Sequence, residues 1–409
     1  MFSTSSTVYT AKYQARALAA VVGDPSRHRF MVGTCSVREE NVIEVIDFDE
    51  ESNALSCVGS IQHPAEVVCV SPSPYDATLL VTCGATAEGC ETRLWSCDVS
   101  GWGARPRYDD DDDDDDDHNI APPQDGWAHR GESAGVGSLT PRTNLGNART
   151  PCAVWCPKEH DRPRALATID ESSLFVWDVE SGEHSRLEVA RPTAAAWSPH
   201  AADEIAVAGV VDVRVFDARL KTPAKHVESP HDGACLDVDY NPNKPFCLAT
   251  SGDDGCVKFW DTRADAPLKI LSGGHSHWVT NVKYNRFHDQ LLVSAGTDRL
   301  VNLWRVSSIS SAPLLELGDT PADDDDDDDE PRGGATDDDD DDDDLDVPER
   351  PSTEATAADV CVRTFDLHDD SVYSLAWSAC NAWAFTSLSY DGRVVLNHVP
   401  SPEKYKILL

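Results

Sequence analysis

Residues 235–263 read CLDVDYNPNKPFCLATSGDDGCVKFWDTR, and this stretch decides the fold. Apolar and polar residues alternate at its start, an Asn-Pro turn follows, and two further apolar runs flank an Asp-containing turn, which predicts three short β-strands. The same order recurs in residues 278–306, WVTNVKYNRFHDQLLVSAGTDRLVNLWRV, and in residues 372–399, VYSLAWSACNAWAFTSLSYDGRVVLNHV. The chain is therefore built from repeats.

Four side chains recur at fixed distances in these repeats. A Thr or Ser, an Asp and a Trp follow a His by 19, 23 and 29 residues. The three sets are His231, Thr250, Asp254 and Trp260; His275, Ser294, Asp298 and Trp304; and His368, Ser387 and Asp391, with Asn397 in place of the Trp. The first two sets lie 44 residues apart, and a period of this size with a closing Trp-Asp is typical of WD-repeat blades of a β-propeller.

We interpret each set as a hydrogen-bonded chain inside one blade. Such a chain satisfies polar groups that are costly to bury alone. Ser, His and Asp are also the residues of a hydrolytic triad, but a catalytic triad does not recur three times at fixed offsets. The recurrence therefore favours a structural role over catalysis.

Weaker copies of the unit account for the rest of the chain. The expected third strands carry Phe48, Trp95, Trp177, Phe216, Trp260, Trp304 and, last in the series, Asn397. The predicted fold is all-β, a seven-bladed WD40 β-propeller. Two candidates remain open for the strand that closes the ring, namely residues 405–409 or a strand at the N-terminus.

The formal charge of −39 comes largely from three acidic runs. Residues 109–117, 323–330 and 337–344 are carboxylates throughout, so 48 acidic and 34 basic residues remain outside them. Segments this polar do not bury enough apolar surface to fold, and we expect two disordered poly-Asp insertions. Both lie between the third and fourth strands of a blade, in blades two and six.

The expected organisation has five parts. They are blades one and two in residues 1–100, an acidic low-complexity insertion in 101–150, blades three to six in 151–306, a second acidic insertion in 307–359, and the outer strand of blade six, blade seven and a C-terminal closure in 360–409.

Composition argues against several classes of function. An acidic chain lacks the basic face that nucleic-acid binding requires, and no apolar run approaches the roughly 18 residues of a membrane span. We find no phosphate loop, metal-ligand cluster or paired-carboxylate site, so we expect no enzyme activity, cofactor, metal or small-molecule substrate. The N-terminus shows no signal segment, which favours a cytoplasmic protein.

Several segments outside the repeat pattern are distinctive. They include RFMVGTCSV at 29–37, NVIEVIDFDEE at 41–51, SLSYDGRVVLNHVP at 387–400 and KYKILL at 404–409. In these segments the chain resembles one WD-repeat family, the EARP- and GARP-complex-interacting proteins of endosomal trafficking. The resemblance spans nearly the whole chain except the insertions, whose pure poly-Asp runs depart from the family.

The resemblance implies a non-enzymatic adaptor. Such a protein binds the EARP and GARP tethering complexes, supports endosomal recycling and retrograde membrane traffic, and reaches the trans-Golgi network and endosomes through its partners without inserting into the membrane. Two other classes stay open. One is the substrate receptor of a cullin ubiquitin ligase, because residues 216–219 and 260–263 read F-D-A-R and W-D-T-R. The other is a histone- or chromatin-binding propeller, because acidic segments attract basic tails.

Candidate partner-binding residues are large side chains near the His loops of blades five to seven. They are His277, Trp278, Asn281, Arg299, Asp370, Tyr373 and Tyr390. Exposed aromatic and Arg side chains are typical interface anchors. For Trp278, packing between two blades is the alternative.

Overall fold

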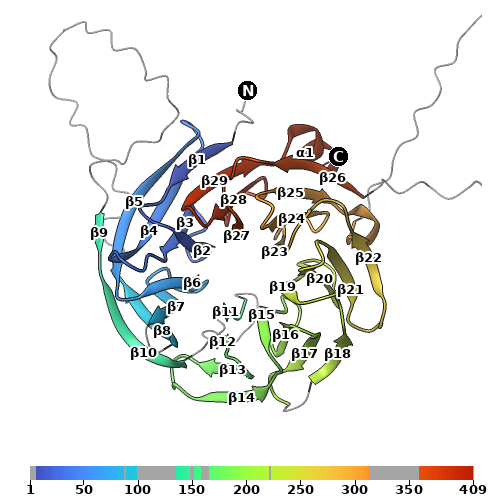
Figure 1. Cartoon of the computed structure of the whole chain (residues 1–409), viewed down its shortest axis with the longest axis horizontal. Helices are drawn as coiled ribbons and strands as arrows, with labels where there is room; N and C mark the ends of the chain where they lie inside the picture. The colour runs from blue at the N-terminus through green and yellow to red at the C-terminus, as the bar shows by residue number, and fades with distance from the viewer. Residues whose placement is uncertain are drawn as a thin grey trace, which may run out of the picture.

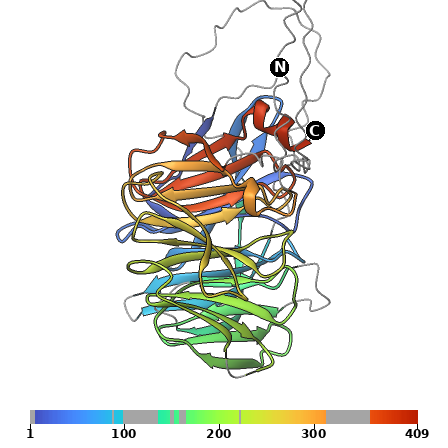
Figure 2. The ribbon, with the colours of Figure 1, turned by 90° about the vertical axis from the view of Figure 1, so that its right-hand side faces the viewer.

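The computed structural model describes residues 6–86, 89–98, 135–147, 152–157, 165–220, 223–312 and 359–408. Seven sheets stand side by side around a central axis (Figure 1), and Figure 2 shows the same ring from its edge. The prediction of an all-β, seven-bladed propeller is confirmed. All three acidic runs lie outside the described residues, so the disorder expected of the two insertions stays a prediction.

The first three blades run in chain order from the inside of the ring to its rim. Blade one holds β2 (Ala15–Ala20), β3 (His28–Thr34), β4 (Asn41–Asp49) and β5 (Ala54–His63). Blade two holds β6 (Glu66–Pro72), β7 (Leu79–Thr86), β8 (Gly89–Cys97) and β10 (Leu139–Asn147). Blade three holds β11 (Cys152–Trp155), β12 (Ala165–Ile169), β13 (Ser173–Asp178) and β14 (His184–Glu188).

The next three blades follow the same pattern. Blade four holds β15 (Pro192–Trp197), β16 (Glu204–Gly209), β17 (Asp212–Asp217) and β18 (Pro223–Glu228). Blade five holds β19 (Cys235–Tyr240), β20 (Cys247–Gly252), β21 (Val257–Asp261) and β22 (Pro267–Leu271). Blade six holds β23 (Val279–Tyr284), β24 (Leu291–Gly296), β25 (Val301–Arg305) and β26 (Val360–Phe365), with the short helix η1 (Ser307–Ile309) after β25.

Blade seven takes its strands from both ends of the chain. β27 (Val372–Trp377), β28 (Ala384–Ser389) and β29 (Arg393–His398) are followed in the sheet by β1 (Thr7–Thr10), which pairs antiparallel with β29. Of the two candidates for the closing strand, the N-terminal one is therefore present. The assignment of closure to the C-terminal segment 360–409 is wrong, because α1 (Ser401–Leu408) is a helix at the rim (Figure 1).

The start of α1 explains this difference. Pro402 and Glu403 lie in its first turn, where proline already has the required φ and a carboxylate favours the positive end of the helix. Lys406 lies in its last turn, where a cation is favoured for the opposite reason. Residues 401–408 therefore favour a helix over a closing strand.

The core lies between neighbouring blades. The second strand of a blade is covered on both faces, so β24 (LLVSAG) and β28 (AFTSLS) are buried along their whole length. Their sequences accordingly read as small and apolar runs with little alternation. Between blades six and seven, Leu291, Val293 and Leu303 pack in one cluster with Leu375 and Phe385. This packing fixes each blade against the next and makes the loops at the two ends of the ring a rigid array.

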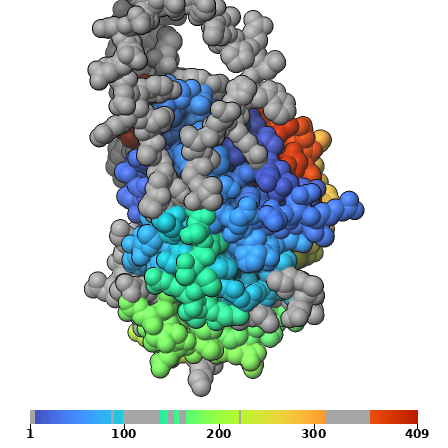
Figure 3. Space-filling model, turned by 90° about the vertical axis from the view of Figure 1, so that its left-hand side faces the viewer, coloured from blue at the N-terminus to red at the C-terminus, as the bar shows by residue number. Residues whose placement is uncertain are grey.

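The connections that carry the acidic runs leave from equivalent places. β10 pairs with β8, and β26 pairs with β25, so each connection joins the third and fourth strands of its blade. β10 is visible on the outside of the ring in Figure 3, in the teal of its residue numbers. A further strand that the sequence did not indicate, β9 (Gly135–Gly137), adds in parallel to β5 at the rim of blade one.

Candidate functional site

Blade five contains the full hydrogen-bonded chain that its spacing predicts. His231 Nδ1 lies 2.9 Å from an Asp254 carboxylate oxygen, and His231 Nε2 lies 2.8 Å from Thr250 Oγ1. The Trp260 indole N–H donates to the same hydroxyl at 2.9 Å. Burial lowers the pKa of His231, so the ring is neutral and uses one nitrogen as donor to Asp254 and the other as acceptor. The Ser/Thr, His and Asp groups satisfy one another.

Blade six repeats this arrangement. His275 Nδ1 lies 3.1 Å from the Asp298 carboxylate, His275 Nε2 lies 2.8 Å from Ser294 Oγ, and the Trp304 indole N–H donates to Ser294 Oγ at 2.9 Å. Asn302 adds a bond that the spacing did not indicate, since its amide donates to the Gly274 carbonyl at 2.7 Å.

Blade seven departs from the pattern. His368 Nε2 lies 2.7 Å from Ser387 Oγ, but His368 Nδ1 meets Ser389 Oγ at 2.8 Å in place of an Asp. Asp391 joins the chain through Ser389, whose hydroxyl donates to it at 2.5 Å. Asn397 does not reach Ser387; its side-chain oxygen accepts a hydrogen bond from Ser6 of the N-terminal segment.

Blade two holds a similar chain that the sequence analysis missed. His63 Nε2 lies 3.0 Å from Thr82 Oγ1, and the Trp95 indole N–H donates to that hydroxyl at 2.7 Å. The signal was present, because Thr82 follows His63 by 19 residues, as in the three predicted sets. The His63 Nδ1 faces the Ala65 carbonyl instead of an Asp.

The predicted partner-binding residues of blade six fall into two groups. Trp278 is 50% exposed, which places the ring at the surface and not in packing between blades. Its ring lies 5.3 Å from that of His277, and His277 Nδ1 contacts Thr297 Oγ1 at 2.5 Å. Arg299 is exposed in the neighbouring turn, with its backbone in the left-handed region at φ 70°. These three side chains are available to a partner.

Asn281 has a different environment. Its amide donates to Asp237 Oδ2 in blade five at 2.7 Å, and its side-chain oxygen accepts the Leu375 N–H of blade seven at 3.1 Å. The residue therefore ties three blades together. Asp370 is half-buried, and its carboxylate accepts the N–H of Ser371.

Tyr373 and Tyr390 form a pair at the junction of blades seven and one. Their rings meet edge to face at 6.1 Å, and the guanidinium of Arg16 lies 4.5 Å over the Tyr373 ring. Both tyrosines are half-buried, while Arg16 is exposed. Arg16 belongs to β2, far away in the sequence, and only the folded ring brings it to the two tyrosines. We call Trp278, His277, Arg299, Tyr373, Tyr390 and Arg16 the His-loop face.

Charged side chains, of which Asp237 is buried and Asp239 and Lys283 are half-buried, hold blades five and six together. On β19, Asp237 accepts the Val282 N–H at 3.0 Å and Asp239 accepts the Tyr284 N–H at 2.8 Å, both from β23. Lys283 Nζ lies 2.7 Å from Asp237. Burial raises the pKa of Asp239 to about 6, although Lys283 and the Tyr284 N–H favour its charged form. These contacts make the candidate face part of a rigid scaffold.

On the opposite face, blades four and five each carry an exposed Arg held by an Asp of the same turn. Arg219 donates twice to Asp217, and Arg263 donates in the same way to Asp261, with distances of 2.9 and 2.6 Å in both pairs. The two Arg side chains are 65% and 67% exposed. The hydrogen bonds from Arg263 lower the pKa of Asp261 to about 2.

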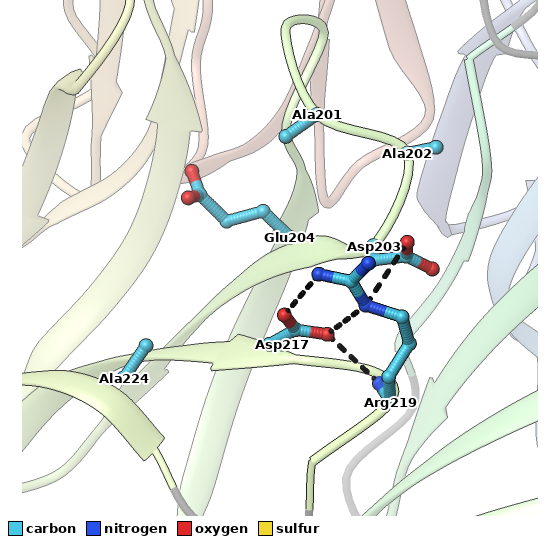
Figure 4. Close-up of a pocket in the computed structure, with 7 residues that line it drawn as sticks. All are labelled: Ala201, Ala202, Asp203, Glu204, Asp217, Arg219 and Ala224. Carbon is cyan, nitrogen blue, oxygen red and sulfur yellow. Dashed lines mark hydrogen bonds and ion pairs between the residues drawn. The ribbon is translucent and has the colours of Figure 1, made fainter.

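Arg219 also lines a small hollow, shown in Figure 4. Asp203 and Asp217 both point toward Arg219 there, and Glu204 and three alanines complete its wall. Its volume of about 220 Å³ is below the 300–1,000 Å³ typical of ligand pockets. The hollow therefore gives no reason to expect a bound small molecule at this place.

The described residues show no arrangement typical of a metal centre, since no group of three or more His, Cys, Asp or Glu is placed to hold an ion. All thirteen cysteines are free thiols. In the part of the chain that the structure describes, no helix is long and apolar enough to cross a membrane.

Comparison with known proteins gives consistent results. A family model described as EIPR1 beta-propeller matches residues 3–100 and 138–304, and a WD domain, G-beta repeat model matches residues 359–396. The EARP-interacting protein homolog of Danio rerio is 33% identical, and the EARP and GARP complex-interacting protein 1 of Rattus norvegicus is 31% identical, each over 98% of both chains. The EARP-interacting protein homolog of Dictyostelium discoideum is 36% identical over 97% of this chain and 95% of its own.

Proposed function

The chain belongs to the EIPR1 beta-propeller family, and on that premise we propose that it is a non-enzymatic adaptor for the EARP and GARP complexes. One observation carries the proposal: the similarity to relatives named for interaction with these complexes runs over 98% of the chain. The adaptor works in the cytoplasm, reaches endosomes and the trans-Golgi network through its partners, and supports endosomal recycling and retrograde membrane traffic.

The His-loop face is the surface that we assign to the complex. Trp278 and Arg299 are exposed on blade six, and the Tyr373–Tyr390 pair lies on the neighbouring blade seven. Aromatic and Arg side chains supply most of the energy in protein interfaces. Blades six and seven hold these side chains in a fixed relation, because Thr280 Oγ1 of blade six donates to the Val372 carbonyl of blade seven at 2.5 Å. A pre-ordered surface loses little entropy on binding.

Affinity purification with mass spectrometry tests the partner. The tagged chain, expressed at a near-native level, should recover subunits of the tethering complexes. Recovering none of them would refute the proposed function, and recovering histones instead would support the chromatin-binding alternative.

A pair of variants tests the surface. Trp278→Ala should reduce the recovered tethering subunits at least about tenfold, which corresponds to ~1.4 kcal/mol for a central aromatic anchor. Val211→Ala is the control, because Val211 is exposed in the β16–β17 turn of blade four, two blades before the turn of Arg299, and is not one of the six residues of the His-loop face. If Trp278→Ala binds like Val211→Ala, the adaptor function can stand, but the His-loop face is not the binding surface.

The second candidate is a substrate receptor of a cullin ubiquitin ligase. Its support is the matched pair of exposed Asp–Arg forks, Asp217–Arg219 and Asp261–Arg263, on adjoining blades. The double variant Arg219→Ala/Arg263→Ala discriminates between the two functions. Loss of cullin-adaptor subunits with unchanged tethering subunits would support this candidate, and recovery of no cullin adaptor by the unaltered chain would dismiss it.

A further inference from the structure

The outermost strand of blade five has an apolar free edge. β22 pairs with β21 on one side, and no described strand pairs with its other side. Leu268 and Ile270 are 44% and 46% exposed, and they alternate with Lys269, so they share one side of the strand. Unpaired backbone groups next to two exposed apolar side chains form a template for another strand.

Blade four carries the same strand with polar or small residues at these positions. β18 reads PAKHVE where β22 reads PLKIL. In both strands the first Pro lies opposite the third-strand aromatic residue, and the register shifts at the same place. Ala224 therefore corresponds to Leu268, and His226 corresponds to Ile270.

Each of the two strands also forms an equivalent Lys–Asp ion pair with the following blade. Lys225 Nζ lies 2.9 Å from Asp265, and Lys269 Nζ lies 2.9 Å from Asp359. Each Asp belongs to the connection between the third and fourth strands of the following blade. Since blade four forms the same strand with Ala224 and His226, folding does not require apolar residues at Leu268 and Ile270.

Other rim strands in the described residues follow blade four. β14 exposes a His, a Ser, an Arg and a Glu, and β26 exposes a Cys, an Arg and a Thr. Polar and charged residues at a free edge discourage association with another strand. On β22 the Lys is half-buried and paired with Asp359, which leaves the exposed side of the strand without such a guard.

We infer that β22 is a docking site for an extended segment of a protein partner, which adds to blade five as a further strand. The partner backbone pairs with the free edge, and its apolar side chains at alternate positions contact Leu268 and Ile270. A second copy of this chain does not fit, because two five-residue strands, each about 17 Å long, bury far less than the roughly 1,200 Å² of a stable interface.

Charge indicates which segment fits. Asp359, which pairs with Lys269, belongs to the connection between β25 and β26. The sequence of this connection contains the acidic runs at 323–330 and 337–344. This many carboxylates attract a basic segment and repel an acidic one. The occupant is therefore an extended segment with alternating apolar residues, flanked by Lys or Arg. This site lies apart from the His-loop face, so its test does not depend on the proposed function.

A fluorescein-labelled peptide, Lys-Lys-Val-Thr-Val-Thr-Val-Lys-Lys, serves as the probe, and its anisotropy is followed as full-length protein is added. The double variant Leu268→Ala/Ile270→His gives β22 the residues of β18 and should weaken binding at least about tenfold, or ~1.4 kcal/mol. The matched control Ala224→Ser/His226→Gln alters β18 and should leave the affinity within about twofold. Equal melting temperatures of the variants and the unaltered protein establish that all of them are folded.

Two further measurements separate strand addition from charge attraction alone. A peptide with Pro in place of the central Val lacks the N–H needed for pairing and should not bind, and a peptide flanked by Glu should bind more weakly. Hydrogen exchange in residues 267–271 should slow with the original peptide, while residues 223–228 stay unchanged. The inference is overturned if the unaltered protein does not bind, if the Leu268→Ala/Ile270→His variant binds equally well, or if the Pro peptide binds as tightly.

Discussion

Glu403 offers the sharpest test of how the C-terminal helix is attached to the ring. Its carboxylate accepts hydrogen bonds from Arg305 Nη1 at 2.7 Å and from Lys406 Nζ at 2.9 Å. The side chains of Arg305 and Glu403 are 6% and 11% exposed, so this ion pair is largely removed from water. Ile407 of the same helix packs against the core cluster between blades six and seven.

Glu403→Gln keeps the shape of the side chain but removes the charge that compensates Arg305. Loss of one partner from a buried ion pair costs about 3–5 kcal/mol, because the other charge stays in a poorly solvated site. Local unfolding of this eight-residue helix would return Arg305 to water, which limits the cost. We therefore expect the lower value, about 3 kcal/mol.

Urea unfolding followed by tryptophan fluorescence measures this loss. A slope of about 3 kcal/mol per M gives a midpoint lower by about 1 M. Lys406→Gln is the first control, because its side chain is 53% exposed and a surface ion pair contributes less than about 1 kcal/mol. Arg305→Met/Glu403→Leu is the second, because it removes both charges and should be closer to neutral than Glu403→Gln. The reasoning fails if Glu403→Gln costs no more than Lys406→Gln, or if the double variant is the less stable of the two.

Three further predictions concern the blades themselves. Burial lowers the pKa of His368 to about 4, so the unfolded chain, with a pKa near 6.5, takes up this proton first as pH falls. The contribution of the neutral His368 to the free energy of unfolding is complete above about pH 6.5 and declines by up to ~3 kcal/mol toward pH 4. The urea midpoint of His368→Gln should therefore fall less over that range than that of the unaltered protein. Trp260→Phe should cost about 1 kcal/mol in urea, since the 2.9 Å bond from the indole N–H is lost while most of the packing remains; no change would mean that this bond does not stabilise the blade. Gly392→Ala should lower the melting temperature more than Gly182→Ala, because both have positive φ but only the Cβ at Gly392 meets a backbone carbonyl of the β1–β2 loop.

The blades and their internal hydrogen bonds could be predicted because a local constraint fixes their spacing. A His that bonds a Thr or Ser on the second strand must precede it by a set number of residues, and His231, His275 and His368 all do so by 19. The same rule finds His63, at the end of β5, as the partner of Thr82 in blade two. It does not predict the partner of the second ring nitrogen, since in blade seven the hydroxyl of Ser389 takes the place that an Asp carboxylate holds in blades five and six.

The closing strand and the candidate face depend on contacts between distant parts of the chain. β1 and β29 lie near opposite ends of the sequence, so no turn or fixed spacing in the sequence indicates that they pair. Tyr390 is half-buried because it meets Tyr373, which in turn lies under Arg16 from the first blade. Trp278 is exposed although its sequence allowed packing between blades. Aromatic side chains near the His loops thus differ in exposure because of contacts between blades, and sequence spacing alone does not indicate these contacts.

Comparison of equivalent positions in blades four and five separates what folding explains from what it does not. Arg219 and Arg263 are equivalent, and each donates from its backbone N–H and its guanidinium to the Asp of its own turn. These Arg residues therefore have a local structural role, which weakens the argument for a cullin adaptor at this face. Leu268 and Ile270 have no such explanation, because Ala224 and His226 occupy the same backbone positions. Of the differences between these two blades, the apolar edge of β22 is the one that a partner explains best.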